Sequence, residues 1–326
     1  MKHLFKMEGY GYRLRPIRLT DAPFIIEVRL EDQQRSQFIH KISRDVSTQE
    51  AWIQAYFERD GDYYFVVENR LTGLPEGLIS FYNAADGAAE WGRWIIKKGS
   101  FAAAESVYLL YRIAFEQAGL QELYCRTVSD NISVVSFHHS IGEKTRTVHK
   151  DLFELNGKRY DAVEQYAGQT LFYETIAPKL EKQAQKIAIR NLQRAIGRFE
   201  FHHIGIATKG IEKEFPFYSL IGYEKEGASF IDPLQGIGGQ FLVGAHLPRL
   251  ELLENLPNAH TLDKQLEQRQ KLYHMAYYVS DIERAIAIFQ CNRAKIISPL
   301  KPSVYFGSRI CFLMLPNMMM IELLEA

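Results

Sequence analysis

The chain has 326 residues, enough for two domains that each bury a full core. Its 39 Lys and Arg residues balance its 39 Asp and Glu residues, so the composition gives no indication of a nucleic-acid-binding or membrane-binding surface. Because the N-terminus shows no signal-peptide pattern and no apolar run is long enough to span a membrane, we expect a soluble, cytoplasmic protein.

The N-terminal part of the chain has the patterns of a mixed α/β domain. Residues 11–19 alternate basic and apolar side chains, which predicts a half-exposed strand. Thr20 and Asp21 can cap a helix that has Pro23 in its first turn. The elements expected next are a helix over 48–58, a strand over 62–69, a turn over 72–75 and a strand over 77–82.

A long strand is expected over 88–96 and a helix over about 103–118, joined by a turn that begins at 97–100. A strand, a short turn of small residues and a helix together present backbone N–H groups and a helix N-terminus to a phosphate group. The later elements are a strand over 123–128, a helix over 131–142 and a hairpin over 151–161 with Asn156-Gly157 as a type I′ turn.

This order of elements resembles the GNAT acyltransferases over roughly residues 10–168. The resemblance implies a domain over residues 1–168 that binds acetyl-CoA or another acyl-CoA and transfers the acyl group to a small amine. The cofactor-binding residues that it implies are Ile95, Ile96, Lys98, Gly99, Ser100, Phe101, Ala102, Ala103 and Asn131. Asparagine also caps helices for purely structural reasons, which is the alternative explanation of Asn131.

Three further residues bear on acyl transfer. Glu105 follows the cofactor turn, where alanines replace the later glycines of the family, and is expected to repel the pyrophosphate. His138 stands where many family members have the Tyr that protonates the leaving thiolate; an imidazole could donate a proton there, and a solvent-facing His is the alternative. Glu90 is placed where relatives keep a catalytic base or water-positioning carboxylate, with a surface carboxylate as the alternative.

The chain contains three cysteines, Cys125, Cys291 and Cys311. They are odd in number, lack CxxC spacing and lie in apolar contexts. We therefore expect core residues in a reducing compartment.

Residues 169–198 are rich in Lys, Gln and Ala and have no Gly before Gly197, which predicts a helical linker. The charge run 179–186 is most simply a solvated face of this helix. The sequence leaves open whether the segment is a spacer or packs two domains together.

The last third of the chain contains an internal repeat. Glu251 follows His203 by 48 positions (251 − 203), and Glu322 follows His274 by the same interval (322 − 274). One His and one Glu are the polar positions that the repeated apolar strands share, and burial of either without a partner is costly. Two imidazoles and two carboxylates suit Zn, Co, Ni or Mn, with positions left open for water or substrate. We therefore predict a site for one divalent metal ion at these four residues.

The same segment resembles the vicinal oxygen chelate (glyoxalase-like) superfamily, and within it methylmalonyl-CoA epimerase and its relatives. The resemblance rests on His203-Ile204-Gly205-Ile206-Ala207, 241–244, 250–254 and 321–325. It implies a metal-binding domain over 199–326 made of two βαβββ modules. It also implies epimerase or isomerase activity on a carbonyl or acyl-CoA substrate, with Glu322 as the base and Glu251 as its counterpart on the opposite face. The alternative is a repeat that has kept the fold and lost the metal.

Together these patterns predict an α+β protein of two domains, a GNAT mixed sheet followed by a vicinal oxygen chelate fold. The leading hypothesis is a bifunctional enzyme: an acyl-CoA-dependent N-acyltransferase for a small amine, with a nucleotide-linked amino sugar as one candidate, and a metal-dependent domain that prepares or corrects the acyl group. The alternatives are an antibiotic-modifying or antibiotic-sequestering resistance protein, and a binding module with an inactive acyltransferase half. The sequence is compatible with a homodimer and indicates no nucleic-acid or membrane partner.

Overall fold

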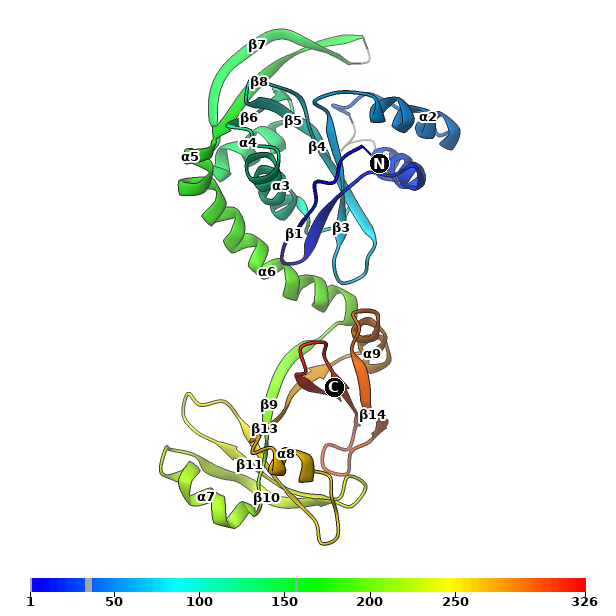
Figure 1. The fold of residues 1–326 in the computed structure, drawn as a ribbon. Coiled ribbons are helices and arrows are strands. Elements are labelled where there is room, and N and C mark those ends of the chain that lie inside the picture. The colour runs from blue at the N-terminus through cyan, green and yellow to red at the C-terminus, as the bar shows by residue number, and fades with distance from the viewer. Residues whose placement is uncertain (1, 33–36, 156) are drawn as a thin grey trace. The chain divides into compact units, whose positions relative to one another are not determined.

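The protein is described by a computed structural model that covers residues 2–32, 37–155 and 157–326. The chain forms two compact units, Met1–Asn191 and Leu192–Ala326. Each unit combines helices with one sheet, so the predicted α+β fold class is confirmed (Figure 1). Within the described ranges, no helix is both long and apolar enough to cross a membrane.

One sheet organises the first unit. Its strand order is β1-β2-β3-β4-β5-β6-β8-β7, and only the β5–β6 pair is parallel. The strands are β1 (Met7–Glu8), β2 (Tyr12–Pro16), β3 (Tyr63–Asn69), β4 (Pro75–Ala85), β5 (Ala88–Ile96), β6 (Glu122–Val128), β7 (Lys144–Leu155) and β8 (Lys158–Gly168). The predicted hairpin over 151–161 is the tip of the longer β7–β8 pair, and its turn residue Asn156 lies outside the described residues.

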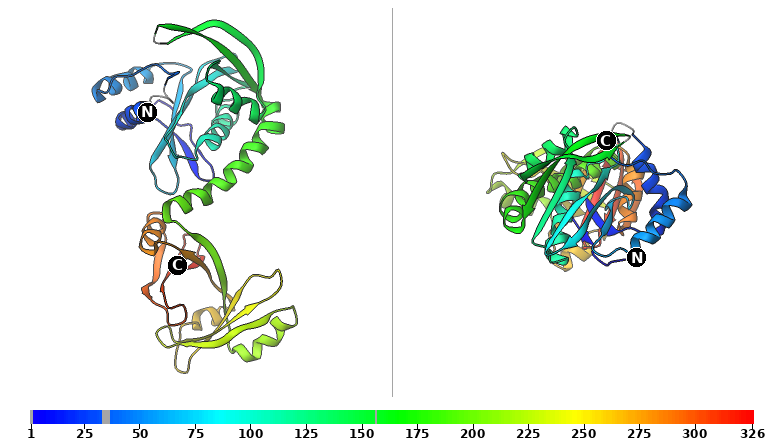
Figure 2. Two further views of the ribbon diagram at one scale, coloured as in Figure 1. Left: turned by 180° about the vertical axis from the view of Figure 1, so that it is seen from behind. Right: turned by 90° about the horizontal axis from the view of Figure 1, so that it is seen from above.

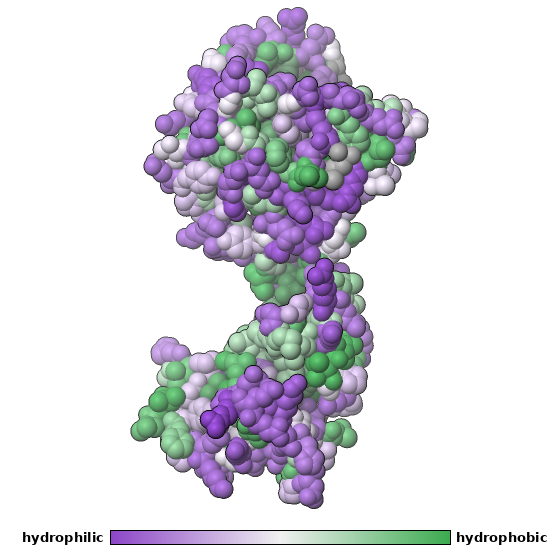
Figure 3. Space-filling model, in the orientation of Figure 1, coloured by the Kyte–Doolittle hydropathy of each residue, from purple (hydrophilic) through white to green (hydrophobic). Residues whose placement is uncertain are grey.

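Helices cover both faces of this sheet (Figure 2). They are η1 (Leu19–Asp21), α1 (Ala22–Leu30), α2 (Val46–Phe57), α3 (Ala103–Arg112) with its π-helical continuation η2 (Ile113–Gln117), and α4 (Ile132–Ile141). Side chains alternate along β3, so Phe65 and Val67 pack with α3, whereas Tyr64 and Val66 pack with α1 and α2. The apolar residues thus form two interior cores, and the face of the first unit visible in Figure 3 is mainly hydrophilic.

The acidic side chains at two helix starts do not bond as the sequence predicts. α2 begins at Val46, two residues before the predicted start, because Asp45 caps it by accepting hydrogen bonds from backbone N–H groups of the first turn. Asp21 precedes α1 as predicted, but its carboxylate makes no cap bond to that helix. It accepts hydrogen bonds from the Arg15 guanidinium and from the backbone N–H of Arg18.

The segment after β8 is helical, as predicted, but most of it, up to Asn191, belongs to the first unit. It contains α5 (Gln169–Leu171), the π-helical η3 (Phe172–Ile176) and α6 (Ala177–Ile196). The side chains of Phe172, Ile176 and Leu180 are buried in the same core as α3. This part of the predicted linker therefore completes the first unit.

The second unit contains two copies of a βαβββ module, in agreement with the predicted fold. The first copy consists of β9 (Phe199–Ala207), α7 (Ile211–Ser219), β10 (Glu224–Asp232), β11 (Ile237–Val243) and β12 (Leu250–Asn255). The second consists of β13 (Leu272–Val279), α9 (Ile282–Cys291), β14 (Lys295–Pro302), β15 (Arg309–Met314) and β16 (Met320–Glu325). A short helix, α8 (Asp263–Glu267), lies between them in the chain.

The sheet of the second unit has a symmetric strand order, β10-β11-β12-β9-β13-β16-β15-β14. The first strands of the two modules, β9 and β13, pair with each other antiparallel at the centre. Each also pairs in parallel with the last strand of its own module, β12 or β16. The two modules are therefore related by a pseudo-twofold arrangement about the β9–β13 pair.

The predicted burial is confirmed for Cys125 and Cys311 and is wrong for Cys291, which is exposed. Cys291 ends α9, whose buried residues include Ile282. Cys291 follows Ile282 by nine positions, and at about 3.6 residues per turn the two lie on opposite faces of the helix. The apolar sequence around Cys291 did not show which face of α9 would be buried.

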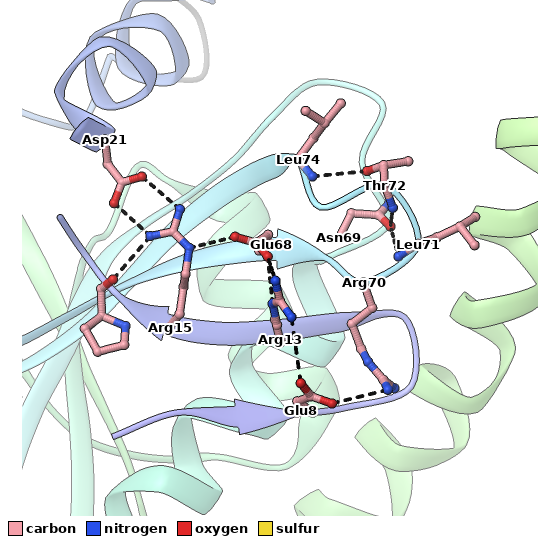
Figure 4. A network of polar contacts seen from close by, with 11 residues as sticks. Glu8, Arg13, Arg15, Asp21, Glu68, Asn69, Arg70, Leu71, Thr72 and Leu74 are labelled. Carbon is pink, nitrogen blue, oxygen red and sulfur yellow. Dashed lines mark hydrogen bonds and ion pairs between the residues drawn. The ribbon is translucent and has the colours of Figure 1, made fainter. Parts of the chain in front are cut away.

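A network of ion pairs joins β2 to β3 (Figure 4). Glu68 is 5% exposed and accepts hydrogen bonds from Arg13 and Arg15. Arg15 also pairs with Asp21 at 2.8 Å. Glu8 pairs with Arg13 at 3.8 Å, but its side chain is 60% exposed. The basic positions of β2 are thus half-buried, as the alternating pattern predicts.

Glu68→Ala is expected to lower the free energy of unfolding of the first unit by about 3 kcal/mol, because it leaves two guanidinium groups without their shared buried carboxylate. Glu8→Ala is the matched control, with an expected loss below about 1 kcal/mol, since its pair is exposed to solvent. Urea denaturation followed by tryptophan fluorescence measures this unit alone, because the chain's three tryptophans all lie in it. Equal losses in the two variants would contradict the argument.

Candidate functional site

Four buried polar side chains converge in the second unit. His203 and His274 lie on the central strands β9 and β13, and Glu251 and Glu322 lie on β12 and β16 beside them. The two imidazole Nε2 atoms are 3.0 Å apart. The Oε2 atoms of both carboxylates lie between 3.1 and 3.5 Å from these nitrogens. The structure thus brings the four predicted metal ligands to one point.

The strand register explains how two imidazoles fit side by side. Across the β9–β13 pair, His274 lies opposite Gly205, and His203 lies opposite Ala276. A Cβ atom at Gly205 would overlap the His274 ring. The small residue two positions after each His therefore makes room for the ring of the other module's His. Sequence reasoning missed both small residues, although the spacing His-x-small occurs in each half of the repeat.

The electrostatics of the quartet fit a bound cation. Burial opposes ionisation of Glu251, but the charge of His203 and hydrogen bonds from both imidazoles lower the pKa of this carboxyl to about 2. Burial disfavours the imidazolium form of His274, but the two carboxylates outweigh it and raise its pKa to about 9. The two carboxylates thus favour a positive charge at this point, which a divalent ion would supply.

A carboxylate oxygen of the quartet also has capacity left for a metal. Glu322 Oε2 is buried and lies 3.2 Å from His274 Nε2, but this contact does not have hydrogen-bond geometry. Two nitrogen and two oxygen donors with spare carboxylate capacity suit Zn, Co, Ni or Mn. These residues therefore fit the predicted metal.

A small cavity of about 10 Å³ adjoins Glu251, His274 and Glu322. Its described lining also includes five Phe and Tyr side chains: Phe230, Tyr273, Tyr305, Phe306 and Phe312. This volume accommodates about one water molecule. An organic substrate would therefore require the aromatic side chains to move.

A larger cavity lies in the first unit where two parallel strands separate. β5 and β6 pair only from Ala88 to Glu90, and they diverge beyond this point. A cavity of about 620 Å³ is lined by residues 91–95 of β5 and 125–128 of β6. Cavities of several hundred Å³ are typical of small-molecule sites.

The predicted cofactor-binding residues lie at the end of β5 and in the turn that follows. Ile95 lines the cavity, and Ile96 ends the strand. Lys98 and Gly99 continue into the turn, where Gly99 has φ +78°, a conformation that favours glycine. Phe101 is exposed. The structure therefore brings one of these five residues to the cavity wall and places the others along the adjoining strand end and turn.

The rest of the turn leads into α3. Ser100 contacts the hydroxyl of Tyr12 at 3.0 Å and accepts a hydrogen bond from the backbone N–H of Ala102. Ala102 is the N-cap residue and offers no side-chain acceptor to the first turn, which begins at Ala103. No side chain therefore caps the N–H groups of this turn. A helix terminus that binds phosphate needs such free N–H groups.

The predicted repulsion by Glu105 is not supported by the position of its carboxylate. This side chain is buried and accepts hydrogen bonds from the backbone N–H groups of Tyr10 and Gly11, on the connection between β1 and β2. Burial raises the pKa of Glu105 to about 7, against the effect of these hydrogen bonds. The Glu105 carboxylate therefore stabilises the connection between β1 and β2. The sequence of the turn alone could not show this role.

The remaining predicted residues are partly or fully buried. His138 lines the cavity and is 1% exposed, so the solvent-facing alternative is wrong. Asn131 also lines the cavity and makes no cap bond to α4, so capping does not account for it. Glu90 lies outside the lining, where it accepts hydrogen bonds from Tyr82 and Arg126 at 3.2 and 3.3 Å. Burial raises the pKa of Glu90 despite the charge of Arg126.

Comparisons with protein families agree with this geometry. Residues 12–144 match the acetyltransferase (GNAT) domain, and residues 202–324 match the Glyoxalase/Bleomycin resistance protein/Dioxygenase superfamily. The chain joins a GNAT domain to a vicinal oxygen chelate domain. The predicted resemblances to the GNAT and vicinal oxygen chelate families are confirmed.

Solved structures similar to the chain include three GNAT proteins. Apo FdhC, described as a nucleotide-linked sugar GNAT, is 22% identical with a TM-score of 0.47, and the match covers 55% of this chain and 98% of FdhC. A variant of the spermidine N-acetyltransferase SpeG from Vibrio cholerae is 17% identical with a TM-score of 0.44, covering 50% and 97%. A probable GNAT acetyltransferase from Chromobacterium violaceum is 16% identical with a TM-score of 0.46, covering 52% and 88%. No curated protein matches the chain significantly.

One residue of the GNAT domain was missed from the sequence. Glu143 follows the left-handed Gly142 that ends α4, and its side chain is fully buried against His138. Nothing in the local pattern marks a charged residue at this position as buried. Its burial depends on the packing of α3 and β6 over the end of α4, which only the tertiary structure shows.

Proposed function

We propose that the GNAT domain transfers an acyl group from acyl-CoA to the amine of an anionic acceptor, such as a nucleotide-linked amino sugar. The charge of its cavity carries this proposal. Guanidinium and ammonium groups line the wall: Arg29, Lys41, Arg59, Arg93 and Arg126. No Asp or Glu belongs to the described lining residues. Such a cavity attracts a phosphate or diphosphate and repels a polycationic amine such as a polyamine.

The basic side chains are not all equally available. Arg93 pairs with Asp62 at 2.7 Å, and Arg126 pairs with Glu90 at 3.3 Å. Lys41 makes no ion pair among the described residues and is exposed. Trp52 also lines the cavity and offers a flat apolar surface for a sugar or a base. Lys41 is therefore the best candidate to bind an acceptor phosphate.

The proposed transfer uses the two predicted catalytic residues of this domain. The amine nitrogen attacks the thioester carbonyl, and the carbon–sulfur bond breaks. His138 would give a proton to the leaving thiolate. Glu90, whose ionisation is disfavoured by burial, would receive the amine proton through Tyr82 or through water, because Tyr82 lines the cavity and donates to this carboxylate.

Lys41→Ala is expected to raise KM for a nucleotide-linked amino sugar about tenfold, as loss of one charge-assisted hydrogen bond implies. The affinity for acyl-CoA, measured by calorimetry, should change little. Lys144→Ala is the matched control, because this exposed lysine of β7 lies outside the cavity lining. Turnover of a polyamine without turnover of any anionic amine would refute the proposed acceptor class.

For the vicinal oxygen chelate domain we propose epimerase-type or isomerase-type chemistry on a carbonyl or acyl-CoA substrate. The quartet His203, Glu251, His274 and Glu322 would hold the divalent metal, which when bound supplies a Lewis acid for a carbonyl oxygen. Glu322 would remove the proton from the carbon next to the carbonyl, and Glu251 would return one from the opposite side. The pseudo-twofold relation of β12 and β16 supports this pair of roles.

Proton exchange tests this second activity. The metal-loaded protein should exchange the α-proton of a substrate acyl-CoA for deuterium in D₂O, as followed by mass spectrometry. Absence of exchange with any acyl-CoA or small carbonyl compound tried, in a sample shown to contain metal, would count against it.

We further propose that this domain sets the configuration of the acyl group that the GNAT domain transfers. In that case the full chain should transfer both epimers of an acyl-CoA, and a metal-free sample only one.

A further inference from the structure

A buried carboxylate lies directly behind His138 in the GNAT domain. Glu143 Oε2 is 2.9 Å from His138 Nδ1, and both side chains are almost fully inaccessible to solvent. Glu143 Oε1 accepts a hydrogen bond of 2.8 Å from the Tyr111 hydroxyl. Cys125 Sγ lies 3.7 Å from Glu143 Oε2 and 3.6 Å from His138 Nε2. These contacts come from β6, α3, α4 and the residue that follows Gly142.

The charge of this carboxylate needs a partner. An ionised carboxylate in the interior is costly unless it is paired and hydrogen-bonded. No Lys or Arg in the described part of the chain forms an ion pair with Glu143. Burial raises the pKa of Tyr111 and of the Cys125 thiol well above their usual ranges, so both stay protonated and neutral. The imidazole of His138 is therefore the group that can balance the charge.

We propose that Glu143 is a positioning residue for acyl transfer: it holds the proton on His138 Nδ1 and stabilises the imidazolium form, so that Nε2 can protonate the leaving CoA thiolate. The inference rests on the proposed transferase activity. In the step, Nε2–H gives its proton to the thiolate sulfur as the carbon–sulfur bond breaks. The attacking amine gives its proton to Glu90 through Tyr82 or water, and the imidazole regains a proton from solvent. Glu143 touches neither substrate and acts through His138.

The same cluster could suggest a different chemistry, in which Cys125 accepts the acyl group. Two observations disfavour this. Cys125 Sγ is nearly equidistant from both ring nitrogens, at 3.7 and 3.6 Å, so it lies beside the imidazole and not along the direction of one N–H bond. The thiol also stays protonated next to the Glu143 carboxylate, which makes it a poor nucleophile. A covalent acyl-cysteine is therefore an outcome that would overturn the proposal.

Glu143→Gln in the full chain tests the inference, because glutamine keeps the shape of the side chain and removes its negative charge. We expect kcat to fall about 100-fold or more with little change in KM for acyl-CoA. The alkaline limb of the pH–rate profile should move down by about one pH unit, because the imidazolium loses its anionic partner. Glu143→Asp should restore part of kcat. His139→Gln, on the exposed side of α4, is the control that should leave both unchanged.

A second readout separates this inference from the transferase proposal. In the substrate-free protein, ¹⁵N NMR of the His138 ring should show a protonated Nδ1, and the Gln variant should show a mixture of tautomers. If the parent protein transfers no acyl group, the proposed function fails, while NMR still decides the role of Glu143. The inference is overturned by an unchanged pH profile in a folded Gln variant, by a deprotonated Nδ1 in the parent, or by an acyl adduct on Cys125 when acyl-CoA is added without acceptor.

Discussion

The His203→Ala variant is expected to bind a divalent metal at least about 100-fold more weakly than the parent protein, because it loses one of four converging donors. The effect is large because the lost imidazole contacts the other three donors: Glu251 at 3.1 Å, His274 at 3.0 Å and Glu322 at 3.5 Å. His274→Ala should behave in the same way. Affinity is measured by competition with a chromogenic chelator after stripping and reloading with Zn, Co, Ni or Mn.

His260→Ala provides the control for this experiment. His260 belongs to the same domain, but it is exposed and pairs on the surface with Asp263 at 2.6 Å. Its replacement should leave the metal stoichiometry at one per chain, as measured by elemental analysis. Acyl-CoA binding should persist in all three variants, because the GNAT cavity lies in the other unit. If the parent chain takes up no metal after reloading, the four side chains form only a hydrogen-bonded scaffold.

Phe172→Ala is expected to lower the free energy of unfolding of the first unit by about 4 kcal/mol, because it removes a fully buried ring. Phe172 stacks on Tyr111 with ring centroids 5.0 Å apart and packs edge-on against Phe115 at 5.5 Å. The loss should appear in urea denaturation followed by tryptophan fluorescence. Tyr173→Ala is the neighbouring control: its side chain is 44% exposed, and the expected loss is below about 1 kcal/mol.

This comparison also tests where the first domain ends. The sequence places the boundary at residue 168, whereas Phe172, Ile176 and Leu180 pack in the core of the first unit. A fragment that stops at residue 168 should therefore lack part of that core and fail to unfold cooperatively. Similar small losses in both variants would show that 169–180 is a spacer after all.

The convergence of His203, Glu251, His274 and Glu322 was predictable from the sequence because these residues break an apolar pattern at a constant interval in two copies. The GNAT cavity was predictable only in part. The order of strands and helices located the turn after β5 and the helix that carries His138. The burial of His138, Glu143 and Glu105 was not visible, because each depends on elements distant in sequence. Glu105, for example, meets the N–H of Gly11 across 94 positions of chain.

Because of the register of β9 against β13, a small residue of each module lies opposite the metal-site histidine of the other module. A bulkier side chain at Gly205 would displace His274, and one at Ala276 would crowd His203, although neither position binds metal. Divergence in one half of this duplicated domain can thus disable a ligand encoded in the other half. A relative that keeps all four donor residues but has a larger side chain at one of these two positions would be unable to form the site, although its sequence would still contain every ligand residue.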